Sequence, residues 1–230
     1  MTIALKYTTF KIALLTLVAS VIVGCSTTKP HEQEAQLKAD KAGLTVVEKT
    51  RFDGTFIAPG AKFSRYKKLF VEQLDMTDVS IRQPSARKIA DEKPWVLSDA
   101  DRRFYQEKYT EALMNNLLGD TVYTTAIQAG ADVLTVSAKV VEIAPLASKD
   151  DLKGRPTNVK VYSEGMGTMT LELTLYDSIS GKPLAIITDQ RDLGRIWEEN
   201  NRTSNNVQVR LAFDQWLGNL RRELDKASGR

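Results

Sequence analysis

The chain has 230 residues, and its 32 Lys and Arg against 29 Asp and Glu give a formal net charge of only +3. The first 24 residues hold two lysines and no acidic residue, so the charge of the remainder falls to +1 and gives no case for nucleic acid binding. With one cysteine, Cys25, and one histidine, His31, the sequence excludes a disulfide framework.

The beginning of the sequence has the pattern of a secretory signal. Lys6 and Lys11 provide a positive flank for an uncharged run over residues 12–24. This run has about 13 residues, whereas a helix that spans a membrane needs roughly 20. We therefore expect a signal peptide that is removed from the mature protein, and not a membrane span.

The uncharged run ends in Ile22-Val23-Gly24-Cys25, which resembles the lipobox of bacterial lipoproteins. The resemblance implies cleavage between Gly24 and Cys25 and lipidation of the cysteine with acyl chains such as palmitate. Two or more such chains hold a protein on a membrane durably. Ser26, in place of an aspartate, favours the outer membrane and a domain that faces the periplasm. A plain secretory cleavage site, or a free thiol at Cys25, is the alternative.

The segment after the cysteine is polar and charged and has almost no large apolar side chain up to Ala42. This composition predicts a mobile tether that includes His31, with a short helix over Glu34 to Lys41 as the alternative. From Leu44 the composition becomes apolar, which marks the start of the folded part. The expected organisation is a lipoprotein signal peptide, a lipidated cysteine with a flexible tether, and a single periplasmic domain (residues 1–24, 25–43 and 44–230).

The first half of the domain predicts two strands and one helix. Residues 52–59 and 66–74 have the composition of strands, and residues 76–94 have that of an excursion over the surface. Ser98 and Asp101 have the spacing of a capping box and predict the start of a helix. Its apolar stripe is typical of a core-facing helix and consists of Tyr105, Tyr109, Ala112, Leu113 and Leu117.

The second half predicts strands and a final helix. The expected strands cover residues 121–127, 133–143, 168–176 and 184–188. The last two form a hairpin, and the polar stretch 146–167 before them is a candidate for contacting a partner. A last helix from about residue 203 to 226 carries Trp216 in its apolar stripe, where a core position is more typical than an interface. This order of elements predicts an α+β fold, with a mostly antiparallel sheet and two main helices packed on one face.

Four segments resemble the bacterial lipoproteins of the family of unknown function DUF3313. They are Phe52–Pro59, Phe63–Val71, Ala131–Leu134 and Tyr176–Gly181. The resemblance covers most of the mature chain and implies an outer-membrane lipoprotein without an established activity. These motifs specify a strand entry and a hairpin turn, so they carry no reaction.

Candidate chemistry in the domain is sparse. A hydrolase of peptidoglycan or another envelope glycan needs paired carboxylates, for which the candidates are Asp150, Asp189, Asp192 and Glu198. Because the domain has no cysteine or histidine for the usual nucleophile and base pairs, we expect no enzyme, no cofactor and no metal site.

The leading hypothesis is a non-enzymatic binding or envelope-assembly module, held on the membrane by Cys25, with an envelope protein or glycan as partner. The alternatives are the carboxylate hydrolase and a purely structural lipoprotein that associates with itself.

Overall fold

The structure is a computed structural model, and it describes residues 29–83, 95–118, 122–146, 162–199 and 202–230. Gly24, Cys25 and Asp150 lie outside these residues. The helices of the described part are α1 (Pro30–Ala42), α2 (Asp99–Ala112) with its π-helical continuation η2 (Leu113–Leu117), and α3 (Arg202–Ser228), and a 3-10 turn η1 spans Phe63–Arg65. Its strands are β1 (Thr45–Val46), β2 (Gly54–Ile57), β3 (Lys68–Val71), β4 (Ser80–Ile81), β5 (Thr124–Thr125), β6 (Val133–Pro145), β7 (Tyr162–Glu164), β8 (Gly167–Asp177), β9 (Pro183–Asp192) and β10 (Trp197–Glu199).

Within these residues, eight strands form one sheet in the order β1-β2-β9-β8-β6-β3-β5, with β4 paired to β6 off this path. Each of the pairs β1–β2, β2–β9, β9–β8 and β8–β6 is antiparallel. Strands β3 and β4 pair in parallel with β6, and β5 pairs in parallel with β3. Strands β7 and β10 form a separate antiparallel ribbon. The α+β prediction with a mostly antiparallel sheet is confirmed.

The long central strands form because their apolar residues alternate. Leu134, Val136 and Ala138 of β6 are buried, and so are Leu173 and Leu175 of β8. The register pairs Val136 with Leu175 and Ala138 with Leu173, so these side chains lie on the same face of the sheet.

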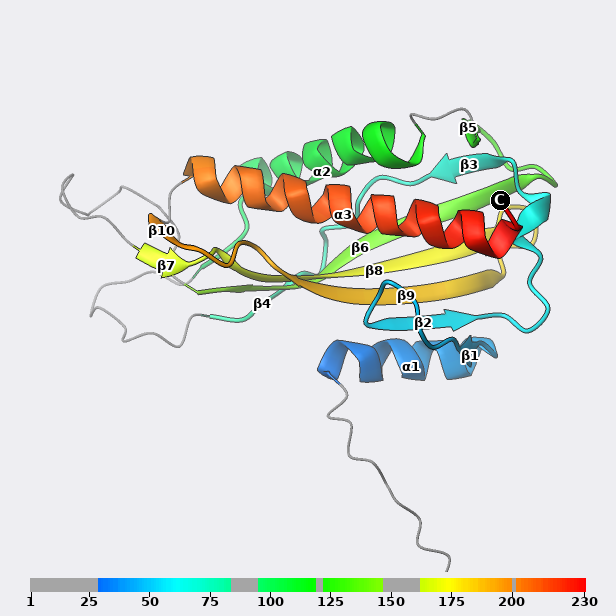
Figure 1. The fold of residues 1–230 in the computed structure, drawn as a ribbon, viewed down its shortest axis with the longest axis horizontal. Helices are drawn as coiled ribbons and strands as arrows, with labels where there is room; N and C mark the ends of the chain where they lie inside the picture. The colour runs from blue at the N-terminus through cyan, green and yellow to red at the C-terminus, as the bar shows by residue number, and fades with distance from the viewer. Residues whose placement is uncertain (1–28, 84–94, 119–121, 147–161, 200–201) are drawn as a thin grey trace, which may run out of the picture.

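Helices α2 and α3 cover that face together and enclose the main core (Figure 1). The rings of Tyr109 and Phe213 meet edge to face at 5.8 Å, and Phe213 also contacts Trp216 at 5.7 Å. All three side chains are fully buried, as are Leu117 and Leu220. The predicted core stripes of both helices are confirmed, and Trp216 is a core residue without an exposed surface to offer to a partner.

The start of α2 is also confirmed. The Asp101 backbone N–H donates to Ser98 Oγ at 3.2 Å, and the Ser98 backbone N–H donates to Asp101 Oδ2 at 2.7 Å. This reciprocal pair satisfies two backbone donors that the first turn of a helix leaves without a partner.

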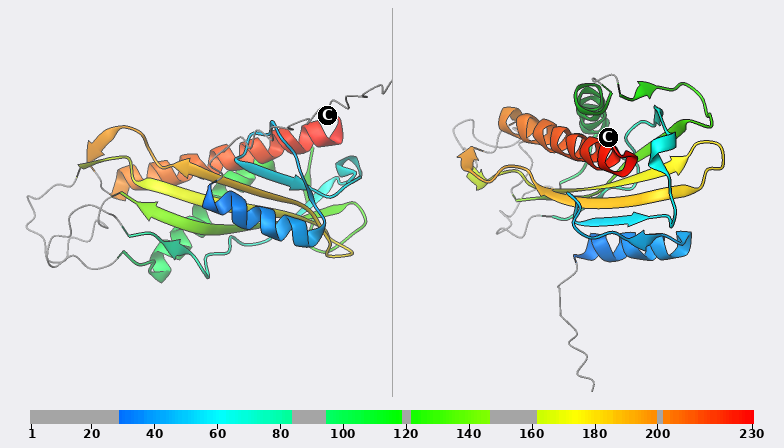
Figure 2. Two further views of the ribbon diagram at one scale, coloured as in Figure 1. Left: turned by 90° about the horizontal axis from the view of Figure 1, so that it is seen from below. Right: turned by 45° about the vertical axis from the view of Figure 1, so that its right-hand side comes forward.

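The prediction of a flexible tether up to residue 43 is wrong for residues 30–42, which form α1, and the alternative of a short helix over Glu34 to Lys41 is the one that the structure confirms. This helix packs on the face of the sheet opposite α2 and α3 (Figure 2). Ala35 and Ala39 are fully buried against a small second cluster with Leu44, Phe56 and Ile186. The helix ends at Gly43, whose φ of 69° favours glycine. The folded domain therefore includes α1 and does not begin at residue 44.

Smaller differences concern the short strands. The predicted surface excursion contains β4, and the strand predicted over residues 121–127 is reduced to the two residues of β5.

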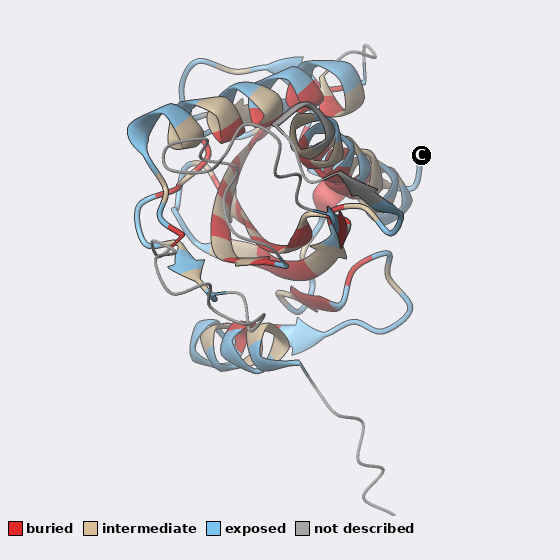
Figure 3. Ribbon diagram, turned by 90° about the vertical axis from the view of Figure 1, so that its left-hand side faces the viewer, coloured by how far each residue is buried: buried red, intermediate tan, exposed pale blue. Residues whose placement is uncertain are grey.

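Colouring by burial shows that the buried residues follow the inner surfaces of the sheet, α2 and α3, with a thinner layer toward α1 (Figure 3). No helix in the described part of the chain combines the length and the apolar character needed to cross a membrane.

Candidate functional site: a polar cluster around Asp53 and Asp189

Polar side chains from α1, β9 and α3 meet at the residue that precedes β2. The register of the sheet pairs Gly54 with Thr188, so Asp53 lies beside Asp189 of β9. The Asp53 backbone N–H donates to Asp189 Oδ1 at 2.9 Å, and the Gln190 backbone N–H donates to Asp53 Oδ2 at 3.0 Å. Each aspartate side chain therefore accepts a hydrogen bond from the backbone of the neighbouring segment, and these two bonds hold the start of β2 against β9.

Asp189 is a buried carboxylate that joins the sheet to α3. Trp216 Nε1 donates to Asp189 Oδ2 at 2.8 Å, and Arg191 Nε lies 2.9 Å from the same oxygen. Burial raises the pKa of Asp189, although Arg191, the Asp53 backbone and Trp216 each act in the opposite direction. Because both carboxylate oxygens accept hydrogen bonds from the protein, Asp189 has the environment of a structural anchor.

Asp53 also interacts with two side chains at the beginning of α1. Lys29 Nζ donates to Asp53 Oδ2 at 2.8 Å, and His31 Nε2 lies 3.1 Å from that oxygen. Partial burial by itself raises the pKa of Asp53, but the hydrogen bonds from Lys29, Gln190 and His31 outweigh it and lower the pKa. The contacts hold the first turn of α1 against the start of β2.

Two open depressions of the surface share Asp53. One has a volume of about 550 Å³ and a polar lining that includes Asp189, Arg191, Asp192 and Arg195. The other has a volume of about 540 Å³ and lies between α1 and the β1–β2 edge. The structure thus brings together two of the acids that the sequence proposed as a catalytic pair.

The geometry gives the paired-carboxylate hydrolase no support. Asp192 Oδ2 pairs with Arg195 Nε at 3.0 Å, and Asp189 is enclosed by the donors described above. A glycosidase needs one carboxyl group to protonate the leaving group and a second to face the sugar from the other side. Glu198 belongs to β10, but its side chain, like Asp150, lies outside the described part.

Another aspartate, Asp177, explains the backbone geometry of the hairpin motif between β8 and β9. Tyr66 Oη donates to Asp177 Oδ2 at 2.8 Å, and Arg65 Nη2 donates to the same oxygen at 2.9 Å. The Ser180 backbone N–H and hydroxyl each donate to Asp177 Oδ1 at 2.8 Å. The Ser180 backbone, the Tyr66 hydroxyl and the Ser180 hydroxyl are the strongest influences that lower the pKa of Asp177 to about 2. This motif therefore fixes backbone geometry, as its sequence indicated.

The ribbon of β7 and β10 carries an exposed apolar surface. Trp197 is 70% exposed, and Ile196 and Tyr162 are also exposed. Trp197 pairs with Glu164 and Tyr162 pairs with Glu199, so the two aromatic side chains lie on the same face of the ribbon. Exposed Trp and Tyr side chains are enriched at binding surfaces, which makes this ribbon a candidate contact surface.

Sequence reasoning missed the contribution of Lys29, His31, Glu32 and Asp53. These residues belong to two separate segments, and His31 and Asp53 are 22 positions apart in the sequence. They meet only because α1 packs on the sheet. The one available signal was His31 itself, the only histidine of the chain.

Solved structures with a similar arrangement share little sequence with this chain. The PelC dodecamer from Paraburkholderia phytofirmans is 12% identical, with 72% of this chain and 96% of that chain covered and a TM-score of 0.36. A protein described as a homolog of the neuraminyllactose-binding hemagglutinin from Helicobacter pylori is 13% identical, with 74% and 92% covered and a TM-score of 0.38. A DUF330 protein from Xanthomonas campestris is 11% identical, with 67% and 81% covered and a TM-score of 0.37. These scores are too low to support any inference about function.

No curated protein matches the chain. The model of one family, described as "Protein of unknown function (DUF3313)", matches residues 33–220, which include α1 from its first turn and most of α3. The chain therefore belongs to the DUF3313 family, as the sequence resemblance indicated.

Proposed function

We propose that the protein is a lipoprotein, anchored through Cys25 in the outer membrane and facing the periplasm, that acts as a non-enzymatic binding or envelope-assembly module. The observation that supports the anchored arrangement best is the short distance along the chain from the lipobox to α1. Pro30 begins α1 five residues after Cys25. At about 3.6 Å per residue at most, the helix starts within roughly 18 Å of the lipidated residue. The lipid anchor would thus hold the folded domain close to the membrane.

The exposed ribbon supports a binding role. Trp197 and Tyr162 offer large amphipathic side chains on one face, and Ile196, which precedes Trp197 in the sequence, is also exposed. Aromatic anchors of this kind contribute much of the binding energy at protein interfaces. An envelope protein or an envelope glycan is the partner that a module at this membrane would meet.

The polar cluster favours binding over hydrolysis. Asp189, the more enclosed of the two candidate acids whose side chains the structure describes, is held by Trp216, Arg191 and the backbone of Asp53. Both oxygens of this carboxyl group already face donors of the protein, which is unfavourable for an acid that must exchange a proton with a substrate. The described residues therefore support contact with a partner better than hydrolysis.

Radiolabelled palmitate tests the anchor. Cells that express the full chain are labelled, and their inner and outer membranes are separated. We expect label on the wild-type protein in the outer membrane and none on the Cys25→Ser variant, while Ser26→Asp, a matched change that keeps the cysteine, should stay labelled and move toward the inner membrane. Label that persists on Cys25→Ser would refute lipidation at this cysteine.

Crosslinking in intact envelopes tests the binding role. A photoreactive amino acid at position 196, beside Trp197, should capture a defined protein or glycan partner, and the same probe at exposed Asp78 should not. Trp197→Ala should reduce the yield at position 196 several-fold. If only a second copy of the chain is captured, the self-associating lipoprotein is the better description; if nothing is captured, the binding module is contradicted.

A further inference from the structure

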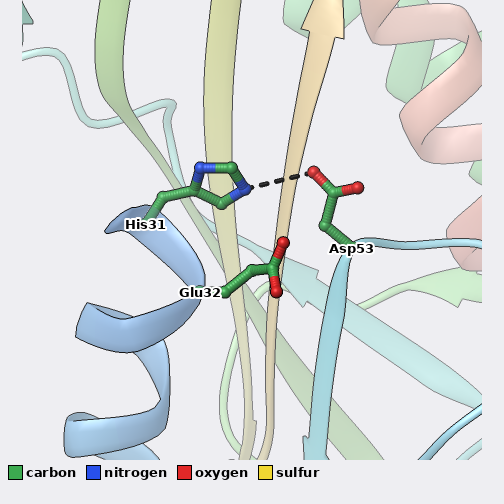
Figure 4. A group of neighbouring side chains, drawn as sticks. All are labelled: His31, Glu32 and Asp53. Carbon is green, nitrogen blue, oxygen red and sulfur yellow. Dashed lines mark hydrogen bonds and ion pairs between the residues drawn. The ribbon is translucent and has the colours of Figure 1, made fainter. Parts of the chain in front are cut away.

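We propose that His31, Glu32 and Asp53 form a binding site for a divalent transition-metal ion, with zinc as the best fit. Each residue offers one ligand atom, and the three atoms lie within 4.8 Å of one another. Figure 4 shows the imidazole of His31 and the carboxylates of Glu32 and Asp53 directed toward a common space between α1 and β2. This proposal does not depend on the lipid anchor.

The ligand set and the spacing suit zinc. Zinc binds imidazole nitrogen and carboxylate oxygen at about 2.0–2.2 Å, so neighbouring ligands of a tetrahedral site are separated by roughly 3.3 Å. His31 Nε2 and Asp53 Oδ2 are already 3.1 Å apart. Glu32 lies in the first turn of α1, and among the described residues its carboxylate has no hydrogen bond or ion pair to give up. A rotation of this side chain would complete three protein ligands and leave a position for water.

The two ligands in contact are held in place by the fold. The His31 side chain is only 7% exposed, although it belongs to a surface helix. The Gln190 backbone N–H fixes Asp53 Oδ2, and the Asp53 backbone is fixed by Asp189. Outer contacts of this kind orient metal ligands and raise the affinity of a site.

The charge of the cluster favours a divalent ion. The carboxylates of Glu32 and Asp53 face one ammonium group, that of Lys29, which lies 2.8 Å from Asp53 Oδ2. With His31 neutral, the cluster has a net charge of −1, and exchange of the ammonium for a divalent ion brings it to zero. Lys29 is 45% exposed, so its flexible side chain can move into water when a metal binds. Lys29 is therefore a competitor of the metal, and the positive end of α1 also weakens binding.

The test uses the full chain with its anchor in detergent micelles, stripped of metal and titrated with zinc against a chromogenic chelator. We expect one zinc per chain. His31→Ala and Glu32→Gln should each weaken binding by roughly ten- to a hundredfold. Glu34→Gln, which removes a carboxylate of the same helix that pairs with Lys38, should leave the affinity unchanged.

Two further measurements separate this site from adventitious binding. Because His31 is the only histidine, its isotope-labelled imidazole gives a single set of NMR signals, which zinc should shift in the wild type and in Glu34→Gln. Lys29→Met should tighten binding, because it removes the competing ammonium. Glu32→Gln breaks no described contact, so a folding defect should not obscure its result. Equal affinity of the wild type, His31→Ala and Glu32→Gln, or an imidazole signal that zinc does not move, would overturn the proposal.

Discussion

Helices α2 and α3 cover one face of the sheet with large side chains, whereas α1 covers the other face with two alanines. On the first face, Trp216, Phe213 and Tyr109 are fully buried in a continuous core. On the second face, Ala35 and Ala39 contact a cluster of only a few apolar residues. Polar contacts supplement this small cluster, since Lys38, Lys29 and His31 all reach acidic partners outside α1.

The difference indicates how each face is stabilised. Burial of large apolar side chains contributes about 1.5–3 kcal/mol per residue, which an alanine cannot match. Exposed ion pairs contribute at most about 1 kcal/mol each. The α1 face should therefore open at a lower free energy than the α2–α3 face, and the helix that follows the predicted anchor is the more weakly held part of the domain.

The largest effect is expected at the centre of the main core. Trp216→Ala should reduce the free energy of unfolding by about 3–5 kcal/mol, because it leaves a cavity and removes a hydrogen bond from buried Asp189. Urea unfolding measures the change. The matched control is Trp197→Ala, which removes a largely exposed tryptophan and should stay within about 0.5 kcal/mol. Similar losses for both variants would contradict this view of the core.

An overpacked α1 should have a smaller effect. Ala39→Leu forces a larger side chain against the sheet and should cost about 1–3 kcal/mol, seen in urea unfolding or as local detachment of α1. Ala42→Leu, at the exposed end of the same helix, is the control and should change stability little. If Ala39→Leu is as stable as the control, the contact between α1 and the sheet is looser than described.

The Asp177 hairpin should make stability depend on pH. Because its folded pKa of about 2 is lower than the ordinary value, the charged carboxylate stabilises the folded state above about pH 4, and this contribution is lost as the pH falls toward 2. Asp177→Asn should therefore reduce the free energy of unfolding by about 1–2 kcal/mol at pH 6, and by much less near pH 2. The control Asp78→Asn changes an exposed carboxylate and should show little effect at either pH. A loss that is equal at pH 6 and pH 2 would rule out this origin.

The smallest effect is expected for the ion pair between α1 and β8. Lys38 Nζ lies 2.8 Å from Glu172 Oε2, and Lys38→Met should reduce stability by about 0.2–1 kcal/mol, less in high salt. Thermal unfolding at two salt concentrations measures the effect. Lys41→Met removes a neighbouring exposed lysine and should have no effect. A loss that does not depend on salt would point to packing of the lysine stem.

Elements with large, regularly spaced apolar side chains could be predicted from the sequence. The strand expected over residues 168–176 is β8 (Gly167–Asp177), and the helix expected from about 203 to 226 is α3 (Arg202–Ser228). Helix α1 was expected only as an alternative to a tether, and its packing on the sheet was missed because its buried residues are two alanines, whose small side chains give no clear apolar stripe. The parallel pairing of β3 with β6 could not be predicted, because a local pattern does not identify the partner of a strand.

The candidate site could be predicted only in part. Asp189 was named only as a candidate acid of the alternative hydrolase, and its role as a partner of Trp216 depends on a contact between β9 and α3. The pairing of His31 with Asp53 depends on α1 lying against the sheet, which the composition of that segment did not indicate. Contacts between distant segments are set by tertiary packing. Where alanines form the packed surface, as in α1, the sequence pattern does not predict this packing.

Native-state hydrogen exchange compares the two faces most directly. Peptides from α1 and from α3 of the full chain are followed by mass spectrometry under conditions in which the protein stays folded. We expect α1 to exchange through openings of clearly lower free energy than α3, and Ala39→Leu to speed exchange in α1 while α3 stays protected. Equal protection of α1 and α3, lost together in the variant, would show that both faces open as one unit and would contradict a weakly held α1.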